Sequence, residues 1–406
     1  MRVQLLVPVL LSAAACADAP TSVRPDGEGD RIVVTNDEAL LSERVQSTGG
    51  VDVPILGTPG AGVLLRATAD TNPKFTLHAL VRAPSVAGRS LLATHVALRG
   101  EYAYVSYMTL GETALGAVEV FDINDPTNPR LVSQALLSNT DVTALAVDGN
   151  HVYLATASHD GKFAEPAVLE RLQLQGGKLT TKSDRVAVPS FVATGVAVTG
   201  GQVYVTSGSG GPGLGGLTAF SRSNLSRVKS DLFADARAVS SPQGSYLAVS
   251  QGSPARLRIY DPSSLALTAT VPLSGGLLPD SKSAVTLDGE WAFVAAGDGG
   301  VQVVDMSRGA LSGTLPRPSV PPGFPAAHEH VTNAVTVMQD IVLTADGAGG
   351  VSVAVSDHKR RRSGERVAVQ ALGRLGLNGS ANFVAAGNTA LFVATGAGGL
   401  QILTIR

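Results

Sequence analysis

The chain has 406 residues, of which 44% are hydrophobic and 16% are charged, and its formal net charge is −2. A chain this long and this apolar can bury a large core, which excludes intrinsic disorder. The near-neutral charge excludes a chain-wide basic surface of the kind that binds nucleic acid, so we expect no nucleic-acid partner. A single cysteine excludes an internal disulfide framework and a metal–thiolate cluster.

Residues 1–15 have the pattern of an export signal peptide. Arg2 gives a positive start, an apolar run follows at residues 3–11, and small side chains precede Cys16. This order resembles a bacterial lipobox, in which the cysteine is lipidated, although Ala13 stands where lipoboxes usually carry leucine. The alternative is an ordinary secretory signal that is cut just before the cysteine. Either reading predicts an exported protein of the bacterial cell envelope, with the lipid on Cys16 as its only membrane attachment.

Residues 16–60 are predicted to form a tether that carries the lipidated cysteine at its start. Their composition shifts to Pro, Thr, Ser, Gly, Asp and Glu, and short apolar runs interrupt it at residues 32–34 and 51–56. We expect the tether to be ordered where it touches the folded body, which we place at residues 61–406.

The body repeats one unit seven times. Each unit has a first strand, a turn and a second strand, and the turn positions recur every 44 to 51 residues, at Gly100, Gly149, Gly200, Gly244, Gly289, Gln339 and Asn388. Alternating apolar and polar residues between turns predict antiparallel strands, and four such strands in each of seven periods are typical of a β-propeller. We therefore predict an all-β fold, a seven-bladed β-propeller of four-stranded antiparallel blades.

The third strand of the unit carries a resemblance to a known family. Residues 118–132 read VEVFDINDPTNPRLV and residues 299–305 read GGVQVVD, so an apolar strand ends in aspartate at Asp122 and Asp305, as it also does at Asp261. These segments resemble the LVIVD-repeat family of bacterial and archaeal cell-surface propellers. The resemblance implies a propeller at a cell surface, and it implies no catalytic residues.

The ring needs a closing strand because the chain ends after three strands of the seventh period. Residues 70–74 match the turn at residues 126–130 that follows the third strand of the first repeat. We therefore predict that Lys74 to Val81 is the fourth strand of the last blade, so that an N-terminal strand closes the propeller. An eighth blade built from residues 31–82 is the alternative.

Long loops on one face of the propeller are the predicted ligand-binding surface. Loops between second and third strands share a face with the blade-to-blade connections, and we call it the top face. Its long loops belong to the first three periods, and loops on a rigid scaffold commonly carry recognition. The predicted ligand contacts are Tyr107, Met108, His159 and Phe163. We predict a non-enzymatic surface binding or scaffold module without a cofactor, whose partner is a surface protein or a glycan.

Two histidines on the top face give an alternative function. His328 and His330 form a His-x-His pair that would direct both rings to one side, and imidazole is a common ligand of zinc and similar divalent metal ions. The alternative is a metal-dependent hydrolase or lyase with a top-face site. A ligand set needs at least three converging groups, however, and His95, another histidine of this face, lies two blades away.

Two further patterns each have a structural and a functional explanation. Six of the seven first strands begin with a small hydrogen-bonding residue, in the column Thr94, Thr143, Thr194, Ala238, Ser283, Asn333 and Asn382. This column could form a polar ring at the mouth of the channel, or it could cap backbone groups at the strand ends. Residues 359–362 and Arg366 form a dense basic cluster, which could meet a polyanion or could be a solvated loop.

Overall fold

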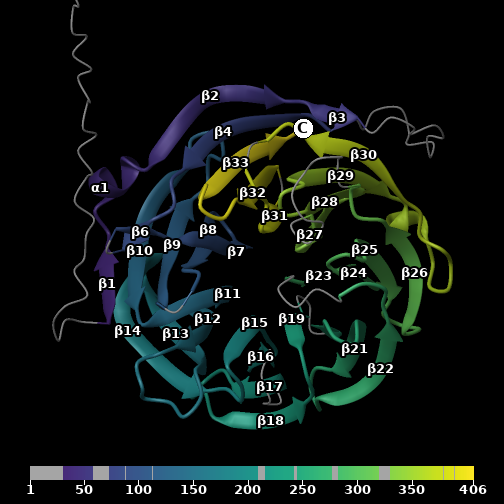
Figure 1. Ribbon diagram of the computed structural model, residues 1–406, viewed down its shortest axis with the longest axis horizontal. Helices are drawn as coiled ribbons and strands as arrows, with labels where there is room; N and C mark the ends of the chain where they lie inside the picture. The colour runs from purple at the N-terminus through teal and green to yellow at the C-terminus, as the bar shows by residue number, and fades with distance from the viewer. Residues whose placement is uncertain are drawn as a thin grey trace, which may run out of the picture.

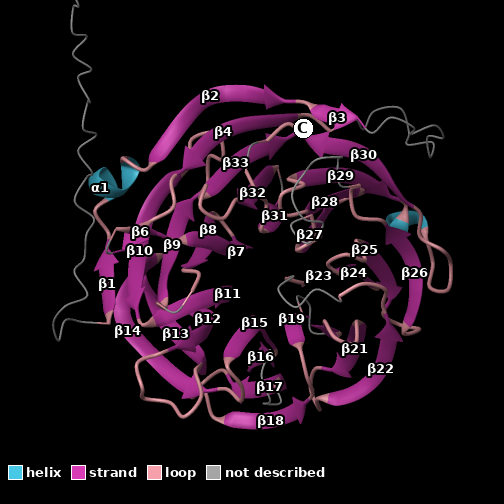
Figure 2. Ribbon diagram, in the orientation of Figure 1, coloured by secondary structure: helices cyan, strands magenta, loops and turns pink. Residues whose placement is uncertain are grey.

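The computed structural model describes residues 31–57, 73–86, 88–111, 113–208, 215–241, 245–276, 282–319, 330–377, 379–387 and 389–406. Its strands form seven antiparallel sheets arranged in a ring (Figure 1). The predicted seven-bladed propeller with four-stranded blades is confirmed. The helices of the described residues are α1 (Glu38–Ser42) and the 3-10 helix η2 (His358–Arg360) (Figure 2), and neither is long and apolar enough to cross a membrane.

Each blade runs outward from the axis in chain order, so that the seven first strands surround the centre (Figure 1). Blade 1 has β7 (Leu92–Arg99), β8 (Tyr102–Met108), β9 (Leu115–Asp122) and β10 (Arg130–Ser138). Blade 2 has β11 (Thr140–Asp148), β12 (His151–Ser158), β13 (Ala167–Gln175) and β14 (Lys178–Ala187). Blade 3 has β15 (Val192–Thr199), β16 (Gln202–Gly208), β17 (Gly216–Ser221) and β18 (Arg227–Leu232).

The remaining blades follow the same order. Blade 4 has β19 (Ala236–Ser240), β20 (Leu247–Gln251), β21 (Arg256–Asp261) and β22 (Ala266–Pro272). Blade 5 has β23 (Ala284–Asp288), β24 (Trp291–Ala295), β25 (Val301–Asp305) and β26 (Ala310–Leu315). Blade 6 has β27 (Ala334–Met338), β28 (Ile341–Ala345), β29 (Val351–Ser356) and β30 (Val369–Leu375). Blade 7 has β31 (Phe383–Gly387), β32 (Ala390–Ala394) and β33 (Leu400–Ile405). A short hairpin, β5 (Ser85–Val86) with β6 (Arg89–Ser90), precedes β7.

The turns between first and second strands explain why the repeat is visible in the sequence. Gly100, Gly149 and Gly200 each have a φ of 57°, a left-handed conformation that glycine adopts without a steric penalty. Gln339 holds the same place in blade 6 with a φ of 54°. The predicted turn positions 244 and 388 lie outside the described residues. Each hairpin is thus set by a local backbone requirement that recurs along the chain.

The last blade is closed by a strand from the N-terminal side of the body. β4 (Phe75–Val81) pairs antiparallel with β33, with Phe75 opposite Ile405 and Val81 opposite Leu400. The backbone groups of Lys74 and Arg406 add two hydrogen bonds, of 2.8 and 2.9 Å. The predicted closing strand is confirmed and the eight-bladed alternative is wrong, because β4 completes blade 7 and the described residues contain no eighth blade.

Residues 31–57 run around the outside of the ring (Figure 1), and we call them the belt. The sequence places them in the predicted tether, yet each of their strands adds a fifth, outer strand to a blade. These strands are β1 (Ile32–Thr35) on blade 1, β2 (Val45–Val53) on blade 7 and β3 (Ile55–Gly57) on blade 6. Ile32 and Val53 are buried, so the two apolar runs of this segment supply the contacts that hold it to the blades.

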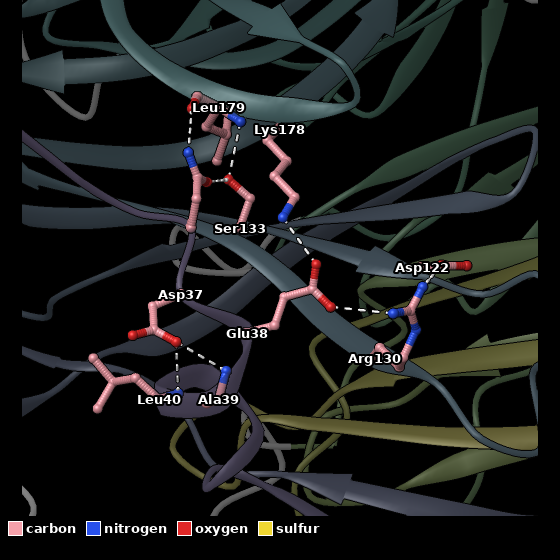
Figure 3. A network of polar contacts seen from close by, with 10 residues as sticks. Asp37, Glu38, Ala39, Leu40, Asp122, Arg130, Ser133, Lys178 and Leu179 are labelled. Atoms are coloured by element: carbon pink, nitrogen blue, oxygen red, sulfur yellow. Dashed lines mark hydrogen bonds and ion pairs between the residues drawn. The ribbon is translucent and has the colours of Figure 1, made fainter.

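Polar contacts fasten the helix of the belt to blades 1 and 2 (Figure 3). Asp37 caps the first turn of α1 with its carboxylate. Glu38 accepts hydrogen bonds from Arg130 of β10 at 3.1 Å and from Lys178 of β14 at 2.8 Å. These pairs are partly exposed, so each adds little to stability, but together they fix where the belt crosses from one blade to the next.

Two arginines of the belt reach buried glutamates inside the blades. Arg44 pairs with Glu119 of β9, and Arg31 pairs with Glu170 of β13. Both glutamate side chains are fully buried. A buried carboxylate without a cation is strongly unfavourable, because the protein interior replaces its hydration poorly. The belt therefore supplies positive charge that the neighbouring blades need.

Candidate binding site

A cavity of about 690 Å³ lies at the centre of the ring, at the end where the first strands begin. All seven blades contribute to its lining, from Thr94 and His95 in blade 1 to Phe383 in blade 7. The first strands begin at the top face, so the cavity lies at that end of the channel. Its volume is in the range of pockets that hold small organic molecules.

The small polar residues at the starts of the first strands tie neighbouring blades together. The hydroxyl of Thr94 donates to the carbonyl oxygen of Val142 in blade 2 at 2.9 Å. Thr143 and Thr194 repeat this contact with the carbonyl oxygens of the following blades, at 2.5 and 2.8 Å. Capping of backbone carbonyl groups therefore explains why threonine stands at these positions. The threonine hydroxyls donate their protons to the protein itself.

The charged side chains in the lining are Asp235, Arg237 and Lys282. The guanidinium of Arg237 donates to both carboxylate oxygens of Asp235 at 2.9 Å, so these two charges offset each other. Lys282 differs, because within the described part of the chain no carboxylate lies against its ammonium group. Burial lowers the pKa of Lys282 from 10.5 to about 8, and no neighbouring anion raises it again.

His95 faces the same cavity from blade 1. Its ring packs against the ring of Phe383 with 4.1 Å between centroids. Burial, together with the charge of Lys282, lowers the pKa of His95 to about 3, so the imidazole is neutral at physiological pH. Its Nδ1 atom is buried and has no hydrogen-bond partner among the described residues. The cavity thus holds one neutral imidazole and one ammonium group without a counter-ion from the described chain.

The four predicted ligand contacts lie in different environments in the structure. Met108 lines the cavity. Tyr107 is fully buried, and its hydroxyl donates to Glu119 at 2.7 Å, so it belongs to the cluster that receives Arg44 and offers no surface to a ligand.

The other two predicted contacts lie on the loop after β12. His159 is exposed there, and Phe163 is half-buried with the guanidinium of Arg185 over its ring, 5.1 Å from the centroid. Neither residue is among those that line the central cavity.

The predicted metal ligands cannot be compared as a pair, because His328 lies outside the described residues. His330 is buried, and its carbonyl oxygen accepts a hydrogen bond from Arg317 at 2.8 Å. In the part of the chain that the structure describes, no three His, Cys, Asp or Glu side chains come together as a metal site.

The basic cluster after β29 is largely ion-paired. Lys359, Arg360 and Arg361 pair with Asp288, Asp340 and Asp357, respectively. These carboxylates offset the positive charge of the cluster. The arrangement favours the solvated-loop explanation over a polyanion-binding patch.

Sequence reasoning missed Lys282 and Arg237 as candidate site residues. Both stand one position before the small polar column, where the seven periods have Ala93, Val142, Ala193, Arg237, Lys282, Thr332 and Ala381. Two cations in a column that is otherwise apolar or small are the signal that could have pointed to the cavity.

Comparisons with known proteins agree with the repeat pattern. Two segments match the LVIVD repeat, residues 92–136 and residues 281–310. No curated protein matches the chain in sequence. Among solved structures, the chain is similar to the computationally designed Ika8 protein at 14% identity and a TM-score of 0.47, over 80% of this chain and 99% of the designed one. The matched segments coincide with blade 1 and with the first three strands of blade 5, so the chain is a seven-bladed propeller in which two blades match the LVIVD repeat.

Proposed function

We propose that this protein is a non-enzymatic binding module of the bacterial cell envelope, held at a membrane by a lipid on Cys16, and that it binds its partner through the central cavity. The observation that carries the proposal is the cavity itself, a space of about 690 Å³ to which every blade contributes. Such a space can receive a small organic molecule or one end of a larger partner, which we take to be a glycan or a surface protein.

The predicted contacts on the top face fit this proposal in part. Met108 lies in the wall of the cavity, and the loop with His159 and Phe163 follows the second strand of the next blade. A partner too large for the cavity would reach this loop as it approaches the top face. Tyr107 has no such role, because its side chain is fully buried and its hydroxyl donates to Glu119.

Narrowing the cavity should abolish binding without unfolding the protein. Ala234 is exposed and lines the cavity, so Ala234→Trp adds a large side chain where the fold can accommodate it. We expect compounds or glycan fragments that raise the melting temperature of the wild type to lose this effect on the variant, because a ligand stabilises only the state that binds it. Thermal-shift screening of a small-molecule and glycan-fragment library measures this.

The matched control is Ala266→Trp, an exposed alanine at the start of the outer strand β22. Ligands of the cavity should stabilise this variant as they do the wild type. Ligands that stabilise all three proteins equally would place binding elsewhere and contradict the proposal.

Membrane attachment should depend on one residue. Cys16→Ser is expected to move the protein from the detergent phase to the aqueous phase, or to leave it unprocessed, because the variant cannot carry the acyl chains. Detergent phase partitioning of cell extracts measures this, with Ala19→Ser as the control. Equal partitioning of the two variants would contradict a lipid anchor.

A further inference from the structure

A backbone hydrogen bond and the effect of its side-chain charge both place Lys282 at the cavity. It stands two residues before the first strand of blade 5, where its N–H donates to the side-chain oxygen of Asn333 in blade 6 at 3.2 Å. Its charge also acts on His95, which belongs to blade 1 on another side of the ring. The side chain of Lys282 therefore faces the central cavity, which separates blade 5 from blade 1.

The charges in the lining do not balance. Among the described residues, four ionisable side chains line the cavity: His95, Asp235, Arg237 and Lys282. Asp235 and Arg237 form a bidentate pair, and the pKa of His95 keeps its ring neutral. One positive charge, that of Lys282, is left without a counter-ion in the described chain. Lys282 is half-buried, so its charge is partly desolvated and opposes folding, and a ligand of opposite charge would remove that cost.

The rest of the lining sets the shape of a ligand that would fit. Met108, Val196 and Phe383 give apolar surface to the same cavity. One cation without a partner among the described residues matches a singly charged anion, whereas a phosphate would bring a surplus of negative charge into the site. We propose, on the basis of the proposed function, that the cavity binds a small organic carboxylate, whose anionic group pairs with Lys282 and whose apolar body lies against Met108 and Phe383.

The pairing has a defined dependence on pH. The free protein holds Lys282 with a pKa of about 8, so the ammonium form dominates below this value and declines above it. A bound carboxylate stabilises the ammonium form and raises the pKa. Carboxylate affinity should therefore be constant from about pH 6 to 7.5 and fall by about tenfold for each pH unit above 8, because binding must then first recharge the amine.

The test uses octanoate, phenylacetate and indole-3-acetate as probes, each beside its neutral amide. Isothermal titration calorimetry is carried out at pH 7 on the wild type, Lys282→Met, which keeps a similar length without the charge, and Lys282→Arg. We expect at least one carboxylate to bind the wild type about tenfold or more tightly than its amide, since charged pairs in desolvated sites contribute strongly. Lys282→Met should remove this preference, and Lys282→Arg should retain most of it.

Two controls separate the charge of Lys282 from other effects. Lys162→Met removes a lysine from an exposed loop, changes the net charge equally, and should leave carboxylate affinity unchanged. Lys282→Met should also melt at a higher temperature than the wild type at pH 7. The folded pKa, about 8, is below the unfolded 10.5, so the penalty is complete below pH 8 and disappears as the pH rises to 10.5. The two melting temperatures should converge over that range.

The outcomes distinguish this inference from the proposed function. Equal affinity for carboxylates and amides, or unchanged carboxylate binding in Lys282→Met, would overturn the inference. If library ligands are blocked by Ala234→Trp but are neutral or cationic, the cavity is a binding site and only the carboxylate assignment fails. If carboxylate binding depends on Lys282 and is also lost in Ala234→Trp, both are supported.

Discussion

Deletion of residues 1–81 is expected to abolish the cooperative unfolding of the propeller, whereas deletion of residues 1–30 should leave it intact. β4 lies between β2 and β33 and pairs with both. Its removal leaves β33 as an open edge and uncovers the buried side chains of Leu403 and Ile405. An open edge with apolar neighbours pairs with other chains, so we expect aggregation. Circular dichroism during heating and size-exclusion chromatography measure both effects.

An intermediate deletion separates the belt from the closing strand. Deletion of residues 1–57 removes the belt but keeps β4, so the ring can still close. We expect a folded protein with a lower melting temperature, because Arg31 and Arg44 are lost together with the outer strands. A soluble, monomeric product of the 1–81 deletion that unfolds cooperatively would show that the ring closes without β4.

The blades could be predicted because each is specified locally. The alternation of apolar and polar residues fixes which side of a strand is buried. The turns at Gly100, Gly149 and Gly200 require a left-handed backbone conformation, and the glycines that adopt it are visible in the sequence. The closing strand was visible for the same reason, since its preceding turn copies that of the first repeat. Repetition thus makes the fold predictable even where the sequence pattern of a single strand is weak.

The belt was not predicted as strands because its pairing is not local. β1 pairs with β10, so Ile32 lies opposite Leu137, a residue more than one hundred positions away. An outer strand buries only one face, and most of β2 is exposed or half-buried. Its composition therefore resembles a linker. The role of Arg31 and Arg44 in holding the belt to the blades is apparent only once their buried partners, Glu170 and Glu119, are known.

The candidate site was only partly predictable because the ring assembles it. His95 and Lys282 are far apart in the sequence and line one cavity only because the propeller closes, which no spacing in the sequence indicates. The long loops and the cavity lie at the same end of the propeller, the top face. Tyr107 was wrongly placed among surface loop residues because β8 continues through Met108, and within the strand alternate side chains point in opposite directions.

Arg44→Ala is expected to lower the free energy of unfolding by about 3–5 kcal/mol, the range found when one member of a buried ion pair is removed. Glu119 is fully buried and receives hydrogen bonds from Tyr107 and Gln134, both at 2.7 Å, besides its contact with Arg44. Burial lowers the pKa of Arg44, but the charge of Glu119 outweighs this and raises it. Denaturant unfolding at pH 7 measures the loss.

Two further variants test whether the uncompensated charge is the cause. In the double variant Arg44→Ala with Glu119→Gln, the buried side chain is neutral, so much of the lost stability should return. Arg130→Ala removes an arginine that forms two surface ion pairs, with Asp122 and Glu38, and it should hardly change stability because solvent screens those charges. If Arg44→Ala were as stable as Arg130→Ala, the hydrogen bonds from Tyr107 and Gln134 alone would suffice for Glu119. The belt would then be fastened by its strands and its buried apolar residues, with no electrostatic requirement from the blades.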